Sequence, residues 1–284
     1  MKFILAKRLC SPILFIALII AGSLSGCKEK ISNLSSQLHQ ETPPAQSPQE
    51  TAEPTTEPSR MIVGKDGAQM VYVPDGVFFM GDDKGDSLER PRMRVFLEAF
   101  YIDRFEISNE RFAKFIKEAN YRPEGGFKFP PGREQYPAQW LTWKDVESYC
   151  KWAQKRLPTE YEWEKAARGV DGRIWPWGND EKNPRKINGE NVPEMLHEFD
   201  DSAGQSAYGC VHMADNVWEW VDDWLSAYVL NSVPDPRYGE KYKVLRGGLE
   251  IKGAKIRYSR ATVRQYMVPD SAAEFTGGRC ARNP

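Results

Sequence analysis

Residues 140–169 read WLTWKDVESYCKWAQKRLPTEYEWEKAARG, and this stretch decides the fold. Its first half predicts a helix over about 143–155 that ends before Pro158, because proline cannot continue a helix. Apolar residues recur at the helical period and form one face of this helix: Val146, Tyr149, Cys150 and Ala153. The stretch therefore predicts a helix that packs one face against a core.

The second half of the stretch predicts a second, capped helix. Thr159 stands at the N-cap position, three residues before Glu162, which is the capping-box pattern. The helix covers about 160–168 and stops at Gly169. Opposite charges at helical spacing predict structural ion pairs here rather than catalytic groups: Arg156, Glu160, Glu162, Glu164 and Arg168.

Composition bounds the size and the class of the protein. The chain has 284 residues, 12% of them aromatic, which is enough for one large domain or two small ones with a substantial core. The formal net charge is −1, and no basic stripe or polybasic patch is present. Nucleic acid is therefore not an expected partner.

The first 26 residues predict a lipoprotein signal peptide. Three basic residues precede the apolar run Ile13–Ala21, which is shorter than the roughly 20 residues that a membrane-spanning helix needs. Leu24-Ser25-Gly26-Cys27 resembles a bacterial lipobox. The resemblance implies cleavage after Gly26 and lipidation of Cys27, which would anchor the protein to a membrane.

Residues 27–60 predict a disordered tether between that anchor and the folded domain. They are rich in Pro, Thr, Ser, Gln and Glu and have few large apolar residues to bury. Lys28, rather than aspartate, follows the lipidated cysteine. In lipoproteins this favours the outer membrane, so we expect a cell-envelope protein facing the periplasm or the surface.

Strands and one further helix are predicted before residue 140. Met70–Gly81 forms two β-rich runs around Pro74-Asp75-Gly76, which predicts a hairpin. Pro91–Tyr101 predicts a strand, and residues 110–119 predict a helix with Asn109 as its cap. Residues 179–207 have weak periodicity and predict a long irregular loop.

Several strings together resemble one known family. YCxWxxxRLPTExEWExAARG, YGCVHMADNVWEWVDDW and the C-terminal PDS through GGRCA are similar to motifs of the formylglycine-generating enzyme, or sulfatase-modifying factor, family. The resemblance covers about residues 70–281 in the family's order. It implies an α+β fold of the irregular C-type-lectin-like kind, with little regular secondary structure, for a domain over 61–284.

The resemblance also implies a copper-binding cysteine pair, C-x4-C, after an RGGS motif. In this chain the positions after Arg246-Gly247-Gly248 fall on Lys252 and Arg257, or on Ile251 and Ile256 in the other alignment. Neither pair contains the thiolates that copper prefers. We therefore expect no thiolate copper site, and assign no catalytic residue.

The remaining cysteines have structural interpretations. By the resemblance, Cys150 and Cys280 form a disulfide; two free buried cysteines are the alternative. Cys210 and His212 are two residues apart and would share a face of a strand, so a Cys–His nucleophile is conceivable. A buried, inert Cys210 thiol is the preferred interpretation.

Calcium is the second ion that the resemblance implies. By the resemblance, the positions of possible calcium ligands are Asn188, Asp215, Asn216, Val217 and Glu219. Glu219 matches a side-chain ligand, Asp215 and Val217 match backbone-carbonyl positions, and Asn188 matches a ligand of a second site. His212 stands where the family has an oxygen donor, and imidazole is a poor calcium ligand. The alternative is that the polar side chains satisfy loop backbone groups instead.

These observations favour a lipid-anchored envelope protein that is not an oxidase and binds a protein, peptide or glycan. The surface residues expected to contact this partner follow the glycine pair: Glu250, Lys252, Lys255, Arg257 and Tyr258. The alternative is an oxidative maturation enzyme, of the formylglycine-generating or siderophore-maturation type, that uses a different residue set. A structural envelope component is the third hypothesis.

Overall fold

The computed structural model describes residues 60–129, 131–180, 204–252 and 255–284, without the side chains of 250–258. The predicted signal peptide, its lipidation site Cys27 and almost all of the predicted tether lie outside the described residues. Within the described ranges, no helix is both long enough and apolar enough to cross a membrane.

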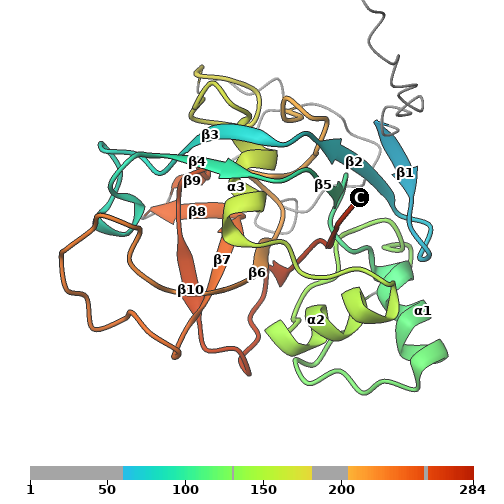
Figure 1. The fold of residues 1–284 in the computed structure, drawn as a ribbon. Helices are drawn as coiled ribbons and strands as arrows, with labels where there is room; N and C mark the ends of the chain where they lie inside the picture. The colour runs from blue at the N-terminus through green and yellow to red at the C-terminus, as the bar shows by residue number, and fades with distance from the viewer. Residues whose placement is uncertain (1–59, 130, 181–203, 253–254) are drawn as a thin grey trace, which may run out of the picture. The chain divides into compact units, whose positions relative to one another are not determined.

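A four-stranded antiparallel sheet joins the two ends of the domain (Figure 1). Its strands, in spatial order, are β1 (Met61–Val63), β2 (Gln69–Val73), β5 (Phe100–Asp103) and β12 (Ala281–Arg282). β12 pairs with β5 through Ala281 opposite Ile102. The last strand of the chain therefore lies in the same sheet as the first.

The second four-stranded sheet carries most of the family-like motifs. Its strands, in spatial order, are β10 (Gln265–Met267), β7 (Lys243–Gly247), β6 (Trp218–Trp224) and β11 (Thr276–Gly277). β6 runs antiparallel to β7, from Trp218 opposite Gly247 to Trp224 opposite Lys243, with an irregularity between Trp220 and Trp224. The short strand β11 lies parallel to β6.

The predicted hairpin at 70–81 is wrong, although both of its strands exist. β2 pairs with β1 and β5, whereas β3 (Gly76–Met80) pairs with β4 (Met93–Leu97) in a separate two-stranded sheet. The bend at Gly76, with φ of +125°, sends the chain out of the first sheet. Turn chemistry thus predicts the bend but not the partner of each strand. The single strand predicted at 91–101 is likewise two strands, β4 and β5.

The described residues also form three α-helices and one 3-10 turn. They are η1 (Ser87–Glu89), α1 (Asn109–Ala119), α2 (Trp143–Trp152) and α3 (Glu160–Arg168). The predicted capping box of α3 is confirmed, since Thr159 accepts a hydrogen bond from the Glu162 amide. Gly169, with φ of 68°, ends the helix as expected.

Two predicted helix ends need correction. α2 ends at Trp152 rather than near residue 155, because Gln154 takes a left-handed conformation with φ of 59°. α1 is capped by Ser108, whose Oγ accepts from the Arg111 amide at 3.2 Å. Asn109 is the first helical residue, and its side chain instead donates to the Arg133 carbonyl at 2.8 Å.

The core has two main apolar clusters, and both include residues of strands β6 and β7. Trp163 of α3 packs in one cluster with strands β2, β5, β6 and β7. Trp220 of β6 packs in the other with α1 and α2. The predicted face of α2 is confirmed, since Val146, Tyr149 and Cys150 are fully buried there.

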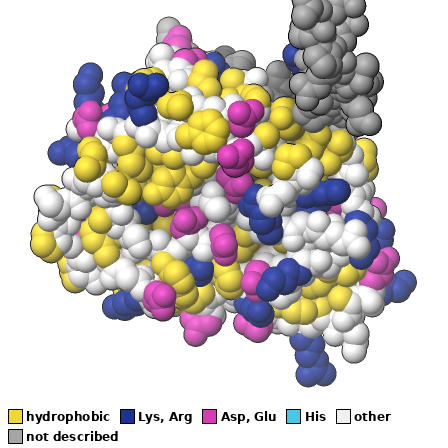
Figure 2. All heavy atoms as spheres, in the orientation of Figure 1, with side chains coloured by type: hydrophobic (Ala, Val, Ile, Leu, Met, Phe, Trp, Pro, Cys, Tyr) yellow, Lys and Arg dark blue, Asp and Glu magenta, His cyan; other side chains and the backbone are white. Residues whose placement is uncertain are grey.

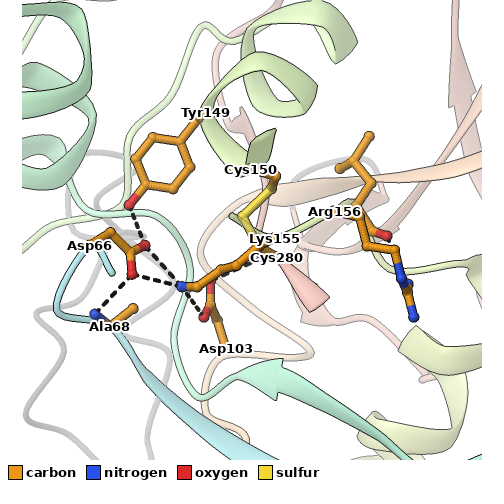
Figure 3. The surroundings of a disulfide bond; sticks show 9 residues. Asp66, Ala68, Asp103, Tyr149, Cys150, Lys155, Arg156 and Cys280 are labelled. Carbon is orange, nitrogen blue, oxygen red and sulfur yellow. Dashed lines mark hydrogen bonds and ion pairs between the residues drawn. A yellow bond between two sulfur atoms is a disulfide. The ribbon is translucent and has the colours of Figure 1, made fainter. Parts of the chain in front are cut away.

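A disulfide joins α2 to the end of the chain, as the family resemblance implied (Figure 3). Cys150 and Cys280 are 130 residues apart in the sequence. Beside them, the buried Lys155 ammonium binds the carboxylates of Asp66, at 2.8 Å, and Asp103, at 2.7 Å. The start of the domain, the end of α2 and the C-terminus are therefore fastened together by one bond and one ion cluster.

Apolar side chains also gather on the outer face of the molecule (Figure 2). On the β3–β4 pair, Val77 and Phe96 stand opposite one another and are 41% and 55% exposed. Nothing in the described chain covers them.

Candidate functional site

The glycine pair after Arg246 is fixed by two tryptophans. Gly247 has φ of 76°, and a Cβ on it would lie 3.1 Å from the Trp163 ring. Gly248 has φ of 63°, and a Cβ there would lie 2.5 Å from the Trp218 ring. Positive φ and close aromatic contact both require glycine. The pair therefore sets the direction in which the chain leaves β7.

The chain leaves β7 into a two-stranded hairpin, β8 (Leu249–Lys252) and β9 (Lys255–Tyr258). Ile251 stands directly opposite Ile256. Lys252 and Arg257 are not opposite one another, because Lys252 pairs with Lys255 and Arg257 with Glu250. The family's C-x4-C pair could align with Ile251 and Ile256 or with Lys252 and Arg257. Only Ile251 and Ile256 are paired across the two strands.

The five predicted binding residues all lie on this hairpin. Glu250 and Lys252 belong to β8, and Lys255, Arg257 and Tyr258 belong to β9. Their backbones are brought together as the prediction requires. Their side chains lie outside the described residues.

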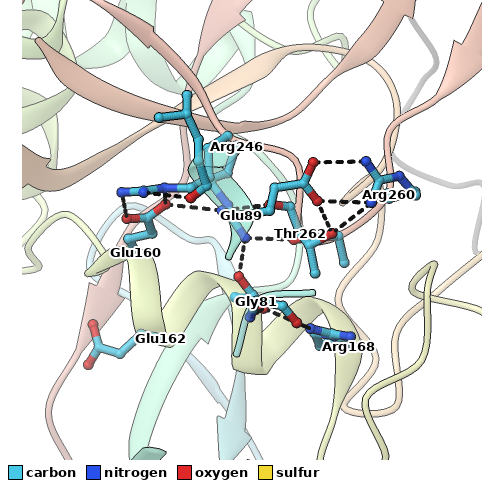
Figure 4. A network of polar contacts seen from close by, with 12 residues as sticks. Gly81, Glu89, Glu160, Glu162, Arg168, Arg246, Arg260 and Thr262 are labelled. Carbon is cyan, nitrogen blue, oxygen red and sulfur yellow. Dashed lines mark hydrogen bonds and ion pairs between the residues drawn. The ribbon is translucent and has the colours of Figure 1, made fainter. Parts of the chain in front are cut away.

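A buried ion network is centred on Arg246 of β7 (Figure 4). Its guanidinium binds Glu160 at 3.0 Å and Glu164 at 2.5 Å, and all three side chains are buried. Arg264 binds both carboxylate oxygens of Glu160, at 2.7 and 2.8 Å. Arg168 binds Glu164 at 2.9 Å.

The network extends to η1, where Glu89 accepts from Arg260 at 2.8 Å and from the Thr262 hydroxyl at 2.6 Å. Every carboxylate in it has an arginine partner. These pairs fix the packing of α3 against β7 and the segment just before β10, and they leave no carboxylate of this network without a partner. The predicted structural role of the charges in the 140–169 stretch is consistent with these pairs, including Arg156 with Glu162 at 2.6 Å.

A second buried pair joins β6 to the C-terminal segment. Arg279 donates to both oxygens of Glu219, each at 2.7 Å. Trp163 Nε1 also donates to Glu219, at 2.8 Å. Both carboxylate oxygens of Glu219 are therefore engaged by protein donors.

This arrangement does not fit calcium at Glu219. Calcium needs six to eight oxygen ligands, and a guanidinium on the central carboxylate places positive charge where the ion would bind. Asp215 contacts His212 Nδ1 at 3.1 Å, and Asn188 lies outside the described residues. Within the described part of the chain, no group of three or more His, Cys, Asp or Glu has an arrangement that could hold a metal ion.

Glu106 is an unusual neighbour of this pair. It is 1% exposed, and neither carboxylate oxygen has a hydrogen-bond partner within the described ranges. Arg279 lies 4.0 Å away. Burial raises the pKa of Glu106 to about 7, while the positive charges of His212 and Arg279 oppose the shift.

Cys210 has the character of an inert thiol. It is fully buried, and burial raises its pKa to about 11. A nucleophilic cysteine needs a lowered pKa and access to substrate. The Ser206 hydroxyl, which accepts from the Cys210 amide at 3.2 Å, belongs to the same loop.

Sequence reasoning did not single out Glu106 or Arg279 as members of a buried charge cluster. The available signal was Glu219 itself, because a carboxylate within a largely apolar strand must find a counter-charge if it is buried. The chain holds 39 Lys and Arg residues, and the sequence does not say which of them that partner is.

Comparison with known proteins assigns the domain to a family. The sequence pattern of the Sulfatase-modifying factor enzyme 1-like domain matches residues 56–284. The chain belongs to this family. A formylglycine-generating enzyme from Thermomonospora curvata is a sulfatase-modifying factor relative that is 32% identical over 285 residues, covering 76% of this chain and 93% of its own.

The family also contains members named as inactive. An inactive C-alpha-formylglycine-generating enzyme 2 from Bos taurus is 30% identical over 273 residues, covering 75% of this chain and 87% of its own. The structure of PvdO from Pseudomonas aeruginosa matches with a TM-score of 0.60 and 23% identity, over 81% of this chain and 100% of PvdO. The predicted sulfatase-modifying factor fold, an irregular C-type-lectin-like α+β domain, is confirmed.

Proposed function

We propose that this sulfatase-modifying factor protein is a lipid-anchored component of the cell envelope that binds a protein, peptide or glycan and does not oxidise cysteine. The binding face is the β8–β9 hairpin. Anchoring through Cys27 would hold this face at a fixed reach from the membrane.

The cysteine inventory of the domain carries this proposal. Cys150 and Cys280 are joined in the disulfide, and Cys210 is buried with a raised pKa. The facing positions of the hairpin are Ile251 and Ile256, and neither has a sulfur atom. A thiolate is the copper ligand and the nucleophile that such oxidation needs, and no accessible thiol is present at this place.

Two further observations support a binding role. The inactive relative of similar length indicates that the family keeps this fold without the enzymatic activity. The hairpin also has four charged residues and one tyrosine at the place where the family's enzymes are expected to have their cysteines. Charged residues at a rim and aromatic anchors are typical of recognition surfaces.

The identity to a formylglycine-generating enzyme favours the alternative, an oxidative maturation enzyme with another residue set. A direct assay separates the two functions. The full-length chain, purified in detergent and loaded with copper, is incubated with a cysteine-containing sulfatase peptide, and the peptide is examined by mass spectrometry for formylglycine. The Thermomonospora curvata enzyme is the positive control. We expect no conversion of the peptide to formylglycine and, in protein purified without added metal, no stoichiometric copper or iron. Detection of formylglycine or of stoichiometric metal contradicts the binding proposal.

The hairpin surface is tested by charge reversal. A Lys252→Glu/Arg257→Glu variant and the wild-type protein are used to recover partners from cross-linked envelope fractions. Lys144→Glu/Lys151→Glu is the matched control, because these two lysines are exposed on α2. We expect the hairpin variant alone to lose the partner. An unchanged set of partners in both variants rejects the hairpin as the binding face.

The anchor is tested separately. Globomycin, which blocks lipoprotein signal cleavage, should cause the precursor to accumulate. A Cys27→Ser variant should leave the membrane fraction or remain uncleaved. Normal processing under globomycin contradicts the anchor and leaves the binding role of the domain intact.

A further inference from the structure

The buried cluster beside the disulfide holds one amine against two carboxyl groups (Figure 3). Lys155 Nζ lies 2.7 Å from Asp103 Oδ1, and 2.8 and 2.9 Å from the two carboxylate oxygens of Asp66. The side chains of Lys155 and Asp66 are each 1% exposed, and that of Asp103 is 3% exposed. The three groups are therefore in contact at a place from which bulk water is excluded.

The cluster has one cation for two carboxyl groups. Among the described residues, no other lysine or arginine forms an ion pair with Asp66 or Asp103. A second buried carboxylate beside the first would be uncompensated, and like charges at this distance favour a proton on one of the two groups. The cluster therefore favours one carboxylate and one protonated carboxyl group.

The surroundings decide which aspartate is the carboxylate. Asp66 accepts from the Tyr149 hydroxyl at 2.7 Å and from the Ala68 amide at 3.2 Å, in addition to Lys155. Burial opposes ionisation of Asp66, but the Lys155 charge and these hydrogen bonds lower its pKa overall. For Asp103, burial outweighs the Lys155 charge and raises the pKa. Asp66 is thus the carboxylate, and Asp103 is the group that keeps a proton.

The two oxygens of Asp103 also differ in their contacts. Oδ2 accepts from the Cys280 amide at 3.1 Å, whereas Oδ1 faces Lys155 Nζ. A backbone amide at one oxygen stabilises the negative charge that develops there when a nucleophile adds to the carboxyl carbon. The cluster therefore holds a nucleophilic nitrogen, a carboxyl group with an oxyanion donor, and a carboxylate, Asp66, that can accept the proton of the amine.

We propose that Lys155 and Asp103 condense to an intramolecular amide bond, with Asp66 as the acid–base group. Asp66 takes a proton from the Lys155 ammonium, and Nζ then attacks Cγ of the protonated Asp103. The new C–N bond forms, the C–Oδ1 bond breaks, and Oδ1 leaves as water with a proton returned by Asp66. The last nitrogen proton passes to Asp66. One ammonium and one carboxyl group thus become one amide and one water, with the remaining proton on Asp66.

The site removes two obstacles that such a condensation meets in water. An amine and a carboxylic acid are both ionised in water, whereas burial disfavours the charged forms. Contact between the groups also converts a bimolecular step into an intramolecular one, which raises its effective concentration. The amide would tie the end of β5 to the segment after α2, across 52 residues of sequence. Unlike the neighbouring disulfide, it would withstand reducing agents.

A tryptic digest of the wild-type, full-length chain tests the proposal. The protein is purified in detergent, reduced, alkylated and digested, and the peptides are sequenced by mass spectrometry. Trypsin does not cleave after a lysine whose amine is part of an amide. We expect a branched peptide in which residues 95–104 are joined to residues 152–156, with the mass of the two peptides less one water.

Lys165 is the matched control within the same digest. It is also buried, but its ammonium donates to the backbone carbonyls of Pro74, at 2.6 Å, and Gly76, at 3.1 Å, rather than to a carboxylate. We expect residues 157–165 as a linear peptide that ends at Lys165. A branch at Lys165 as well would show that the bond does not depend on the two aspartates, and would reject the mechanism.

Variants then separate the acid–base role of Asp66 from a structural one. Newly synthesised chains are sampled over time, and the branched peptide is counted only in chains that carry the native Cys150–Cys280 disulfide. Asp66→Ser keeps a polar oxygen beside Tyr149 but removes the carboxylate, and should slow the condensation about a hundredfold. Lys155→Arg keeps the charge and should give linear peptides alone.

Three results overturn the proposal. The first is a wild-type protein that carries the disulfide and yields linear peptides alone, and this result does not depend on how any variant folds. The second is a branch from Lys155 to Asp66, which would reverse the assigned roles of the aspartates. The third is an equal rate of condensation in the wild type and Asp66→Ser.

Discussion

Glu219 and Arg279 show how single residues hold this domain together. Their two-point ion pair is fully buried, and it connects the second sheet to the segment that carries Cys280. Removing one partner leaves the other as an uncompensated buried charge. The penalty of such a change exceeds that of losing an exposed pair.

We therefore predict that Glu219→Gln lowers the free energy of unfolding by about 3–5 kcal/mol. Urea denaturation followed by tryptophan fluorescence measures the change. Glu147→Gln is the control, because Glu147 pairs with two exposed lysines and should contribute less than about 1 kcal/mol. Similar losses in the two variants would mean that the Glu219–Arg279 pair is not formed as described.

Asp223 predicts a pH dependence of stability. Burial raises its pKa to about 6 in the folded protein, from 3.8 in the unfolded chain. As the pH rises from about 4 to 6, the unfolded state releases this proton first, so the aspartate progressively destabilises the fold, by up to about 3 kcal/mol. Below both pKa values this penalty is absent.

The test compares urea unfolding of the wild type and Asp223→Asn across this pH range. The difference in unfolding free energy should change in favour of the variant as the pH rises. A constant difference would show that Asp223 ionises normally in the folded state.

At the scale of elements, local chemistry in the sequence predicts the helices well. The Thr159 capping box and Gly169 bound α3 as expected, because caps act within a few residues. Pairing of strands depends on distant partners, so the β2–β3 turn was mistaken for a hairpin. The family resemblance, rather than periodicity, identified the disulfide and the irregular fold.

The hairpin register offers a test of the element that replaces the family's cysteines. Paired Cα atoms in antiparallel strands are about 4.5–5.5 Å apart, within the range of disulfides. Ile251→Cys/Ile256→Cys should therefore form an internal disulfide. Lys252→Cys/Arg257→Cys should keep two reactive thiols, because those positions are offset by two residues.

Thiol titration with Ellman's reagent, together with intact mass, distinguishes the two variants. Cys210 is buried and should contribute little to the native signal in both. The reverse pattern would indicate a hairpin shifted out of the observed register.

At the scale of the whole molecule, the Cys150–Cys280 bond restrains the unfolded chain. A loop of 130 residues predicts a stabilisation of about 4–5 kcal/mol from chain entropy. Cys150→Ala/Cys280→Ala should lose this amount in denaturant unfolding, and a reducing agent should destabilise the wild type but not the variant. Equal sensitivity of both proteins to the reductant would show that the bond contributes nothing.

The sequence alone located one of the candidate sites but not the others. The sequence located the hairpin by its missing cysteines, since that only requires counting from the glycine pair. It did not reveal the buried ion network, because Glu160, Arg246 and Arg264 lie far apart in the sequence and only the fold brings them together.

The disulfide also has a mechanical consequence. When the two ends of the domain are pulled apart, the force passes through the Cys150–Cys280 bond. The elements between these cysteines, from α3 to β11, are therefore not stretched. Those 130 residues correspond to roughly 450 Å of contour length that remains hidden while the bond is intact. Under tension, β1 and β2 would be pulled out first, because they precede Cys150. The segment that contains Trp163 and Trp220 would extend only after the disulfide is reduced.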